Sequence, residues 1–192
     1  MNKFQNWQNV LDRLKSGNTN FVNDTLNNKL QDSIRRKEIV DGQNPFAVVL
    51  TCSDSRIVPE LIFDTGIGEI FVIRVAGNVA NPSSIASIEY AVAHLDIKLI
   101  IVLGHQNCGA VTAALARGNS GRSINHLLNF IHPAISLSDS KKVDDVSHIH
   151  AKLTAEQLIA QSYIIAKAID NNALNIIPAY YNLESGQVDF FE

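Results

Sequence analysis

The stretch "FAVVLTCSDSR", residues 46–56, joins a nearly continuous apolar run to a cysteine, a carboxylate and a guanidinium. Such β-branched runs are typical of strands buried on both faces of a parallel sheet. Two similar runs follow, "EIFVIRVAG" at 69–77 and "LIIVLGH" at 99–105. Helical patterns alternate with these runs, which predicts βαβ crossovers. The sequence therefore predicts an α/β fold with a mostly parallel central sheet flanked by helices.

The N-terminal segment is predicted to form a helical arm of two amphipathic helices. Apolar residues recur at three- and four-residue steps over residues 4–14, and "SGN" at 16–18 is expected to end this first helix. Thr19 is the expected cap of the second helix. Its apolar stripe steps by four residues through Val22, Leu26, Leu30 and Ile34.

Further helices are predicted along the rest of the chain. "NPSSIASIEYAVAHLD" at 81–96 begins with a proline and serines, and an Ala-rich helix follows at 108–118. The next segment is expected to be helical as far as Pro133 and then to continue as a polar loop. Residues 151–170 are predicted to form one helix. Its expected core positions are Leu153, Leu158, Ile164, Ile165 and Ala168.

The tail at 174–192 contains two strand-like runs around the turn "ESG", which predicts a C-terminal antiparallel hairpin at the edge of the sheet. The whole chain is expected to be a single domain. Its predicted parts are the N-terminal arm at 1–40, the core that carries the site at 45–118, and the helices and terminal hairpin at 119–192.

Composition and charge exclude several classes of function. The chain has 192 residues, a formal net charge of −3 and a pI near 6.0, without a block of like charges. A nucleic-acid or membrane partner is therefore not expected. The N-terminal sequence has no secretory features, and two cysteines do not make a disulfide framework. A cytoplasmic location is the resulting expectation.

Both cysteines follow apolar runs and are expected to meet in space. Cys52 ends the first predicted strand, while His105 and Cys108 lie at the end of the third. Neighbouring parallel strands are about 4.8 Å apart, and their carboxyl ends are where α/β sheets form sites. Two thiolates and one imidazole with an open fourth position match a catalytic zinc site. A disulfide between the cysteines, or a cysteine nucleophile with His105 as its base, are the alternatives.

Asp54 and Arg56 extend this hypothesis. In an extended segment, residues two apart point the same way, so both side chains could lie beside Cys52. An arginine that forks onto the carboxylate would hold it off the metal and turn it toward a zinc-bound water. The alternative is a surface ion pair of little consequence. Gly109 would permit close backbone approach at the start of a helix whose positive end favours the Cys108 thiolate.

These motifs resemble those of one known family. "CSDSR" followed by "GHQNCGA", with "EIFVIRVAGN", "SSIASIEYAV" and "YNLESGQV", is similar to the β-class carbonic anhydrases. The resemblance implies one Zn²⁺ per chain on Cys52, His105 and Cys108, with Asp54 and Arg56 as the orienting pair. It also implies a homo-oligomer, a dimer or a dimer of dimers, in which the N-terminal arm embraces the partner. The positions that match the family's substrate pocket are Gln43, Phe71, Tyr90 and Gly109.

The function implied is the reversible hydration of CO₂ to bicarbonate and a proton by a zinc-bound hydroxide. Two thiolates neutralise the charge of Zn²⁺, so the bound water should be less acidic than on three imidazoles, and activity should rise toward alkaline pH. One alternative is a hydrolase of a linear CO₂ analogue, CS₂ or COS, that uses the same site. Another is a non-catalytic zinc module that senses bicarbonate.

Overall fold

The structure is a computed structural model that describes residue 4 and residues 6–192. Within these residues the chain forms a five-stranded sheet in the order β2-β1-β3-β4-β5. Every neighbouring pair is parallel except β4 and β5, which are antiparallel. This confirms the predicted α/β fold with its terminal edge hairpin. The strands are β1 (Ala47–Thr51), β2 (Ile70–Arg74), β3 (Leu99–His105), β4 (Asn175–Tyr181) and β5 (Val188–Phe190).

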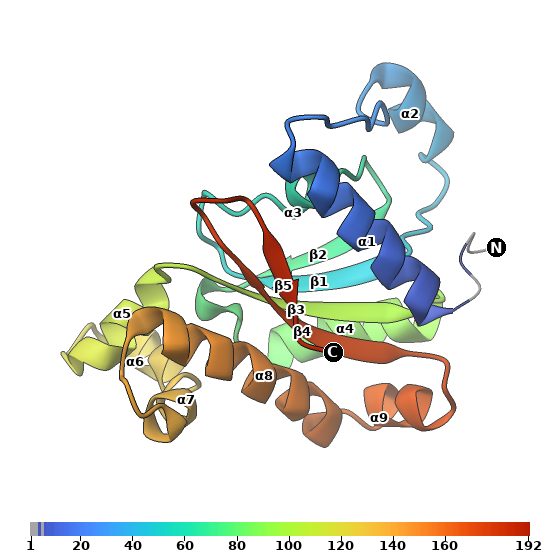
Figure 1. Cartoon of the computed structure of the whole chain (residues 1–192). Coiled ribbons are helices and arrows are strands. Elements are labelled where there is room, and N and C mark those ends of the chain that lie inside the picture. Colours follow the sequence, from blue (N-terminus) through green and yellow to red (C-terminus); the bar gives the residue numbers. More distant parts are fainter. Residues whose placement is uncertain (1–3, 5) are drawn as a thin grey trace.

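Helices cover both faces of the sheet (Figure 1). One face packs against α1 and α3, while α4, α8 and α9 cover the other. Helices α5, α6 and α7 lie together beyond the carboxyl end of β3, on the left of Figure 1. The helices are α1 (Trp7–Val22), α2 (Ser33–Glu38), α3 (Pro59–Ile62), α4 (Pro82–His94), α5 (Gly109–Ala116), α6 (Arg122–Leu128), α7 (His132–Leu137), α8 (Val143–Gln161) and α9 (Tyr163–Asp170), with a short 3-10 turn η1 (Ala76–Asn78).

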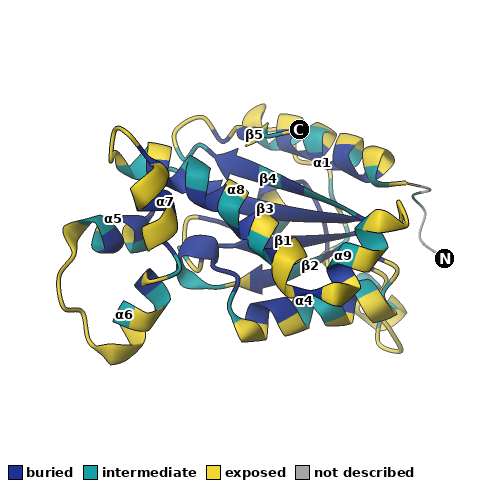
Figure 2. Ribbon diagram, turned by 90° about the horizontal axis from the view of Figure 1, so that it is seen from below, coloured by how far each residue is buried: buried dark blue, intermediate teal, exposed yellow. Residues whose placement is uncertain are grey.

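The central strands are buried on both faces, as their apolar sequences predict. All residues of β1 and β3 are buried (Figure 2). Alternate residues of these strands contribute to two separate apolar clusters, one on each side of the sheet. A third cluster contains Cys52 and Cys108 and is closed by α5, α6 and α7. The carboxyl end of the sheet is therefore enclosed by its own small core.

The N-terminal arm differs from the prediction of two helices. Helix α1 continues through "SGN" to Val22, and Thr19 lies inside it. A Cβ on Gly17 would lie 1.9 Å from the Phe63 carbonyl oxygen, so this glycine allows the helix to approach another segment. The buried Asn18 side chain donates to the Gly186 carbonyl at 2.9 Å. These two residues serve tertiary contacts and do not end the helix.

The predicted second helix of the arm is wrong over most of its length. Residues 23–32 form turns and irregular structure, and only the short α2 follows. The Asp64 carboxylate accepts hydrogen bonds from the backbone N–H groups of Asn27 and Asn28, at 3.1 Å and 2.9 Å, which organises this loop. The expected stripe is largely exposed, with Leu26 at 47% and Ile34 at 66%. Residues 1–3 and 5 of the predicted arm lie outside the described residues.

The helix predicted at 151–170 is two helices, and the polar loop predicted before it is mostly helical. Pro133 stands in the first turn of α7, and α8 already begins at Val143. The Ser162 hydroxyl accepts a hydrogen bond from the Ile165 N–H and so caps α9 where α8 has ended. Of the expected core positions, Leu158 and Ile165 are fully buried, Leu153 and Ala168 are partly buried, and Ile164 is 40% exposed.

Candidate metal centre

Cys52, His105 and Cys108 meet at the carboxyl end of the sheet. Cys52 directly follows β1, His105 ends β3, and Cys108 immediately precedes α5. One ligand atom from each residue lies within 4.8 Å of the other two. All three residues are buried, and neither cysteine forms a disulfide. The predicted convergence of the two motifs is confirmed.

His105 is oriented for ligation. Its Nδ1 lies 2.9 Å from the carbonyl oxygen of Gln106, which can only accept, so the ring proton is on Nδ1. Nε2 is buried and has no hydrogen-bond partner among the described residues. A buried nitrogen lone pair beside two thiols is what a ligand for a borderline-soft metal ion requires. The three residues therefore fit a zinc ion.

The backbone around the cysteines favours thiolates. The Gly77 N–H donates to Cys52 Sγ at 3.3 Å. The hydrogen bond to Cys52 and burial raise the pKa of Cys108, and the N–H groups of Val111 and Ala110 at the start of α5 offset only part of this rise. Between the two thiols, a hydrogen bond from Cys108 stabilises the Cys52 thiolate, so the pKa of Cys52 is lowered and that of Cys108 is raised.

Asp54 and Arg56 form the forked pair that the sequence suggested. Arg56 Nε donates to Asp54 Oδ1 at 2.9 Å, and Nη2 donates to Oδ2 at 2.7 Å. The Arg56 side chain also holds the pKa of the Asp54 carboxyl far below its usual range. Arg74, at the end of β2, donates to the Asp54 carbonyl at 2.6 Å and fixes the loop from the other side. Asp54 is thus an ionised acceptor in a fixed orientation.

The predicted pocket residues are dispersed in the single chain. Gly109 lies next to Cys108 as the first residue of α5, and a Cβ added to it would meet nothing within 4 Å. Phe71 is paired with Val48 in the first half of its strand, and Gln43 is exposed before β1. Both therefore lie toward the opposite end of the sheet from Cys52. Tyr90 is 52% exposed on α4 and packs against His94.

Two residues beside the cluster were not predicted as part of the site, namely Gly77 and His150. Gly77 contacts Cys52, as described above, and the ring of His150 lies 2.7 Å from the Gly77 carbonyl oxygen. A sequence signal for His150 exists. It falls on a buried four-residue stripe of α8 that includes Val146 and Thr154. The stripe begins in the part of α8 that precedes the helix predicted at 151–170.

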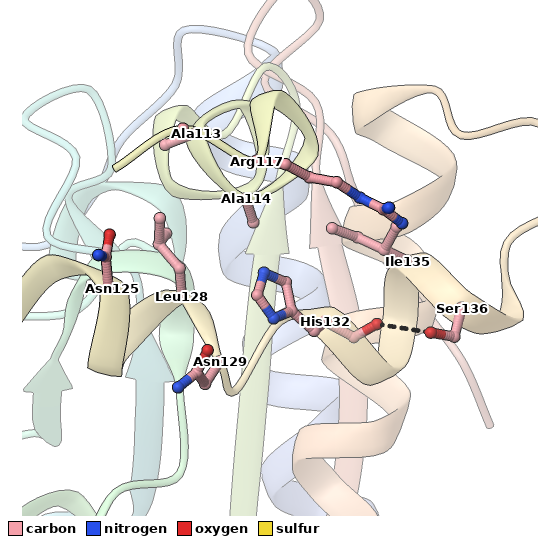
Figure 3. A pocket seen from close by; sticks show the side chains of 10 residues that line it. Ala113, Ala114, Arg117, Asn125, Leu128, Asn129, His132, Ile135 and Ser136 are labelled. Atoms are coloured by element: carbon pink, nitrogen blue, oxygen red, sulfur yellow. Dashed lines mark hydrogen bonds between the residues drawn. The ribbon is translucent and has the colours of Figure 1, made fainter. Parts of the chain in front are cut away.

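A surface cavity of about 530 Å³ lies between α5, α6 and α7 and does not include the cysteine cluster. In Figure 3 the His132 ring points toward Ala114, and Arg117 extends toward Ile135. Ser136 donates to the His132 carbonyl at 3.2 Å. The lining is Ala113, Ala114, Arg117, Gly118, Asn125, Leu128, Asn129, His132, Ile135 and Ser136.

The fold and the cluster together define an α/β protein with a candidate catalytic metal site at the carboxyl edge of its sheet. The family model described as carbonic anhydrase matches residues 47–188. The chain therefore belongs to the carbonic anhydrase family, as the sequence motifs indicated. It is an enzyme of the carbonate dehydratase type, and CO₂ hydration is the general reaction of this family.

Relatives and solved structures agree with this assignment. Carbonic anhydrase 2 of Mycobacterium tuberculosis is 38% identical over 181 residues, which cover 91% of this chain and 87% of the relative. The carbonic anhydrase of Mycolicibacterium smegmatis is 36% identical and covers 92% of this chain and 89% of its own length. Among solved structures, the β-carbonic anhydrase CafA of Aspergillus fumigatus superimposes with a TM-score of 0.73 at 26% identity, covering 97% of this chain and 90% of CafA.

A tetrameric β-carbonic anhydrase of Sordaria macrospora superimposes with a TM-score of 0.74 at 22% identity, over 96% of this chain and 95% of that structure. At this identity the likeness concerns the fold alone. In the described part of this chain, no helix is both long and apolar enough to span a bilayer.

Proposed function

We propose that this chain binds one Zn²⁺ through Cys52, His105 and Cys108 and uses it to hydrate CO₂ reversibly to bicarbonate and a proton. The observation that carries the proposal is the buried cluster itself, in which the His105 Nε2 lone pair has no partner among the described residues. Three ligands leave the fourth position of a tetrahedral zinc ion open to a reactant.

The metal and the forked pair have separate tasks. When bound, zinc supplies a nucleophile from water near neutral pH. The Asp54 carboxylate accepts a hydrogen bond from the attacking water and so orients its lone pair toward the carbon of CO₂. Arg56 occupies both carboxylate oxygens of Asp54, which keeps this group from becoming a fourth metal ligand.

The charge of the ligand set predicts the pH dependence. Two thiolates cancel the double positive charge of zinc, whereas three neutral imidazoles would not. The pKa of a zinc-bound water should therefore be lowered less by this ligand set than by three imidazoles. The Gly77 N–H donates to Cys52 Sγ and supports its thiolate form, and a bound zinc ion would itself hold Cys108 as a thiolate. Turnover is therefore expected to rise toward alkaline pH.

A second copy of the chain would complete the substrate pocket. Gln43 and Phe71 lie toward the opposite end of the sheet from Cys52, and Tyr90 is 52% exposed. If these residues line the pocket, as the family resemblance implies, a partner subunit must bring some of them to the metal. A homo-oligomer, at least a dimer, is therefore part of the proposal.

The substitution Asp54→Asn tests the assignment. Asparagine keeps the size of the side chain but removes the ionised acceptor, so turnover should fall by at least about 100-fold. Zinc content should stay at one per chain, because Asp54 is not a ligand. The control is Ser53→Ala, which changes an exposed neighbour in the same loop and should preserve both quantities. Unchanged CO₂ hydration by metal-loaded Asp54→Asn would mean that Asp54 and Arg56 form a surface ion pair without a role in turnover.

A further inference from the structure

Helix α8 buries a histidine to which the proposed reaction gives no task. His150 is 1% exposed, and its Nε2 lies 2.7 Å from the Gly77 carbonyl oxygen. A carbonyl only accepts, so the proton of the ring is on Nε2 and His150 is the donor. Nδ1 has no hydrogen-bond partner among the described residues. Burial lowers the pKa of His150 to about 4, so the ring is neutral at pH 7.

Gly77 connects this ring to the metal centre. Its backbone N–H donates to Cys52 Sγ at 3.3 Å, while its carbonyl accepts from His150. The two hydrogen bonds lie on either side of one Cα, so together they fix both dihedral angles of Gly77. The residue has φ 70° and ψ 23°, in the left-handed region that glycine adopts without strain.

The contact with His150 is needed because the Gly77 carbonyl is buried. An unpaired buried carbonyl is costly, and the turn η1 would rotate or open to find another donor. Any such rotation would also move the Gly77 N–H, which points at Cys52 from the same residue. Side chains on two other segments close the remaining space, since a Cβ on Gly77 would lie 3.0 Å from Ile131 Cδ1 and 3.1 Å from Ala110 Cβ.

We propose that His150 is a positioning residue for the metal centre. Its Nε2–H holds the Gly77 carbonyl and thereby aims the Gly77 N–H at the Cys52 sulfur. This hydrogen bond withdraws electron density from the thiolate and fixes its orientation toward the metal. The proposal rests on the zinc site of the proposed function. Loss of an outer-shell hydrogen bond of this kind weakens metal binding by about 10- to 100-fold.

Three variants separate positioning from general stability. His150→Phe keeps an aromatic ring but removes the donor, whereas the amide of His150→Gln can still donate to Gly77. Leu158→Ala removes a buried side chain from the same helix two turns away, without touching Gly77. Zinc affinity, measured by chelator competition, should fall about 10- to 100-fold in His150→Phe and stay near the wild-type value in the other two variants.

The Co²⁺-substituted proteins give a spectroscopic readout that does not depend on activity. Without the Gly77 hydrogen bond the Cys52 lone pair rises in energy, so the thiolate-to-cobalt charge-transfer band should move to longer wavelength in His150→Phe. The bands of His150→Gln and Leu158→Ala should remain at the wild-type position. An unshifted band together with wild-type zinc affinity in His150→Phe would overturn the proposal. An equal loss of affinity in Leu158→Ala would overturn it too, because stability alone would then explain the effect.

A measurement on the wild-type protein decides the case if His150→Phe does not fold. In the ¹¹³Cd-loaded protein, NMR should show a scalar coupling between ¹¹³Cd and the Gly77 amide hydrogen, and His150 protonated on Nε2. A proton on Nδ1, or the absence of that coupling, would overturn the proposal. Failure of the proposed function is distinct, because the wild-type protein would then bind no stoichiometric zinc or would bind zinc without hydrating CO₂.

Discussion

Replacing Gly77 by alanine should destabilise the protein by an amount that can be worked out from two features. The first is backbone conformation. Gly77 has φ 70°, and placing an L-residue in the left-handed region costs about 1–2 kcal/mol. The second is space. The new Cβ would lie 3.0 Å from Ile131 Cδ1 and 3.1 Å from Ala110 Cβ. Overpacking of a well-packed core costs about 1–3 kcal/mol.

Together these terms predict that Gly77→Ala lowers the free energy of unfolding by about 2–5 kcal/mol. The side chain of Ile131 is fully buried, so it has little freedom to move away. Urea denaturation of the metal-free protein, followed by circular dichroism, measures the change. Zinc affinity should fall in the same variant, because the Gly77 N–H would be displaced from Cys52.

The matched control is Gly118→Ala. A Cβ there would meet nothing within 4 Å, and Gly118 is not among the glycines with positive φ. This variant should be neutral or more stable by up to about 1 kcal/mol, since alanine restricts the unfolded chain. Ordinary surface substitutions change the free energy of unfolding by no more than about 0.5 kcal/mol. A change that small in Gly77→Ala would refute the account of its conformation and packing.

Three further predictions concern the ligands, the N-terminal helix and pH. Cys52→Ala and Cys108→Ala should each lose stoichiometric zinc by metal analysis, and full metal content in both would contradict the ligand assignment. Gly17→Ala should destabilise by about 3 kcal/mol or more in urea, because its Cβ would lie 1.9 Å from the Phe63 carbonyl oxygen. Helix propensity alone would make Gly17→Ala more stable by about 1 kcal/mol, and a gain of this size in the free energy of unfolding would contradict that contact. Below pH 6.5 the unfolded state protonates His150, whereas the folded state, with a pKa of about 4, does not. Between pH 6.5 and 4, the free energy of unfolding of the metal-free wild type should therefore fall by about 3 kcal/mol more than that of metal-free His150→Gln. Equal losses in the two proteins would contradict the burial argument.

The sheet and the metal cluster could be predicted from sequence because their signals are local. Each central strand is a short β-branched run, and its site residues come directly after it. Parallel strands place such residues at one edge, so Cys52 and His105 converge without any knowledge of side-chain packing. The helix at Pro82–His94 was predictable for the same reason, since Asn81 and Ser84 form a capping box.

The N-terminal arm could not be predicted in this way. A glycine followed by asparagine ordinarily ends a helix, yet Gly17 and Asn18 lie inside α1 because they contact residues far along the chain. The apolar residues after Val22 step by four, but the Asp64 carboxylate binds the backbone of that segment in an irregular form. Tertiary hydrogen bonds overrode both local patterns.

His150 shows a related limit at the site itself. The four-residue stripe with Val146 and Thr154 indicates that His150 is buried, but it does not indicate which group its ring donates to. Its role depends on the orientation of the Gly77 carbonyl, which only the folded turn defines. The dispersal of Gln43, Phe71 and Tyr90 has a different cause under the proposed function, in which a partner subunit brings some of these residues to the metal.

The most direct test of the central claim is stopped-flow CO₂ hydration by metal-quantified protein, scanned from about pH 6.5 to 9 across the range in which zinc-bound waters ionise. The account predicts one zinc per chain and rapid turnover that rises toward alkaline pH. Full zinc content without turnover would contradict the proposed reaction and would favour a CO₂-analogue hydrolase or a bicarbonate sensor. Turnover without zinc would contradict the assignment of Cys52, His105 and Cys108 as the metal ligands.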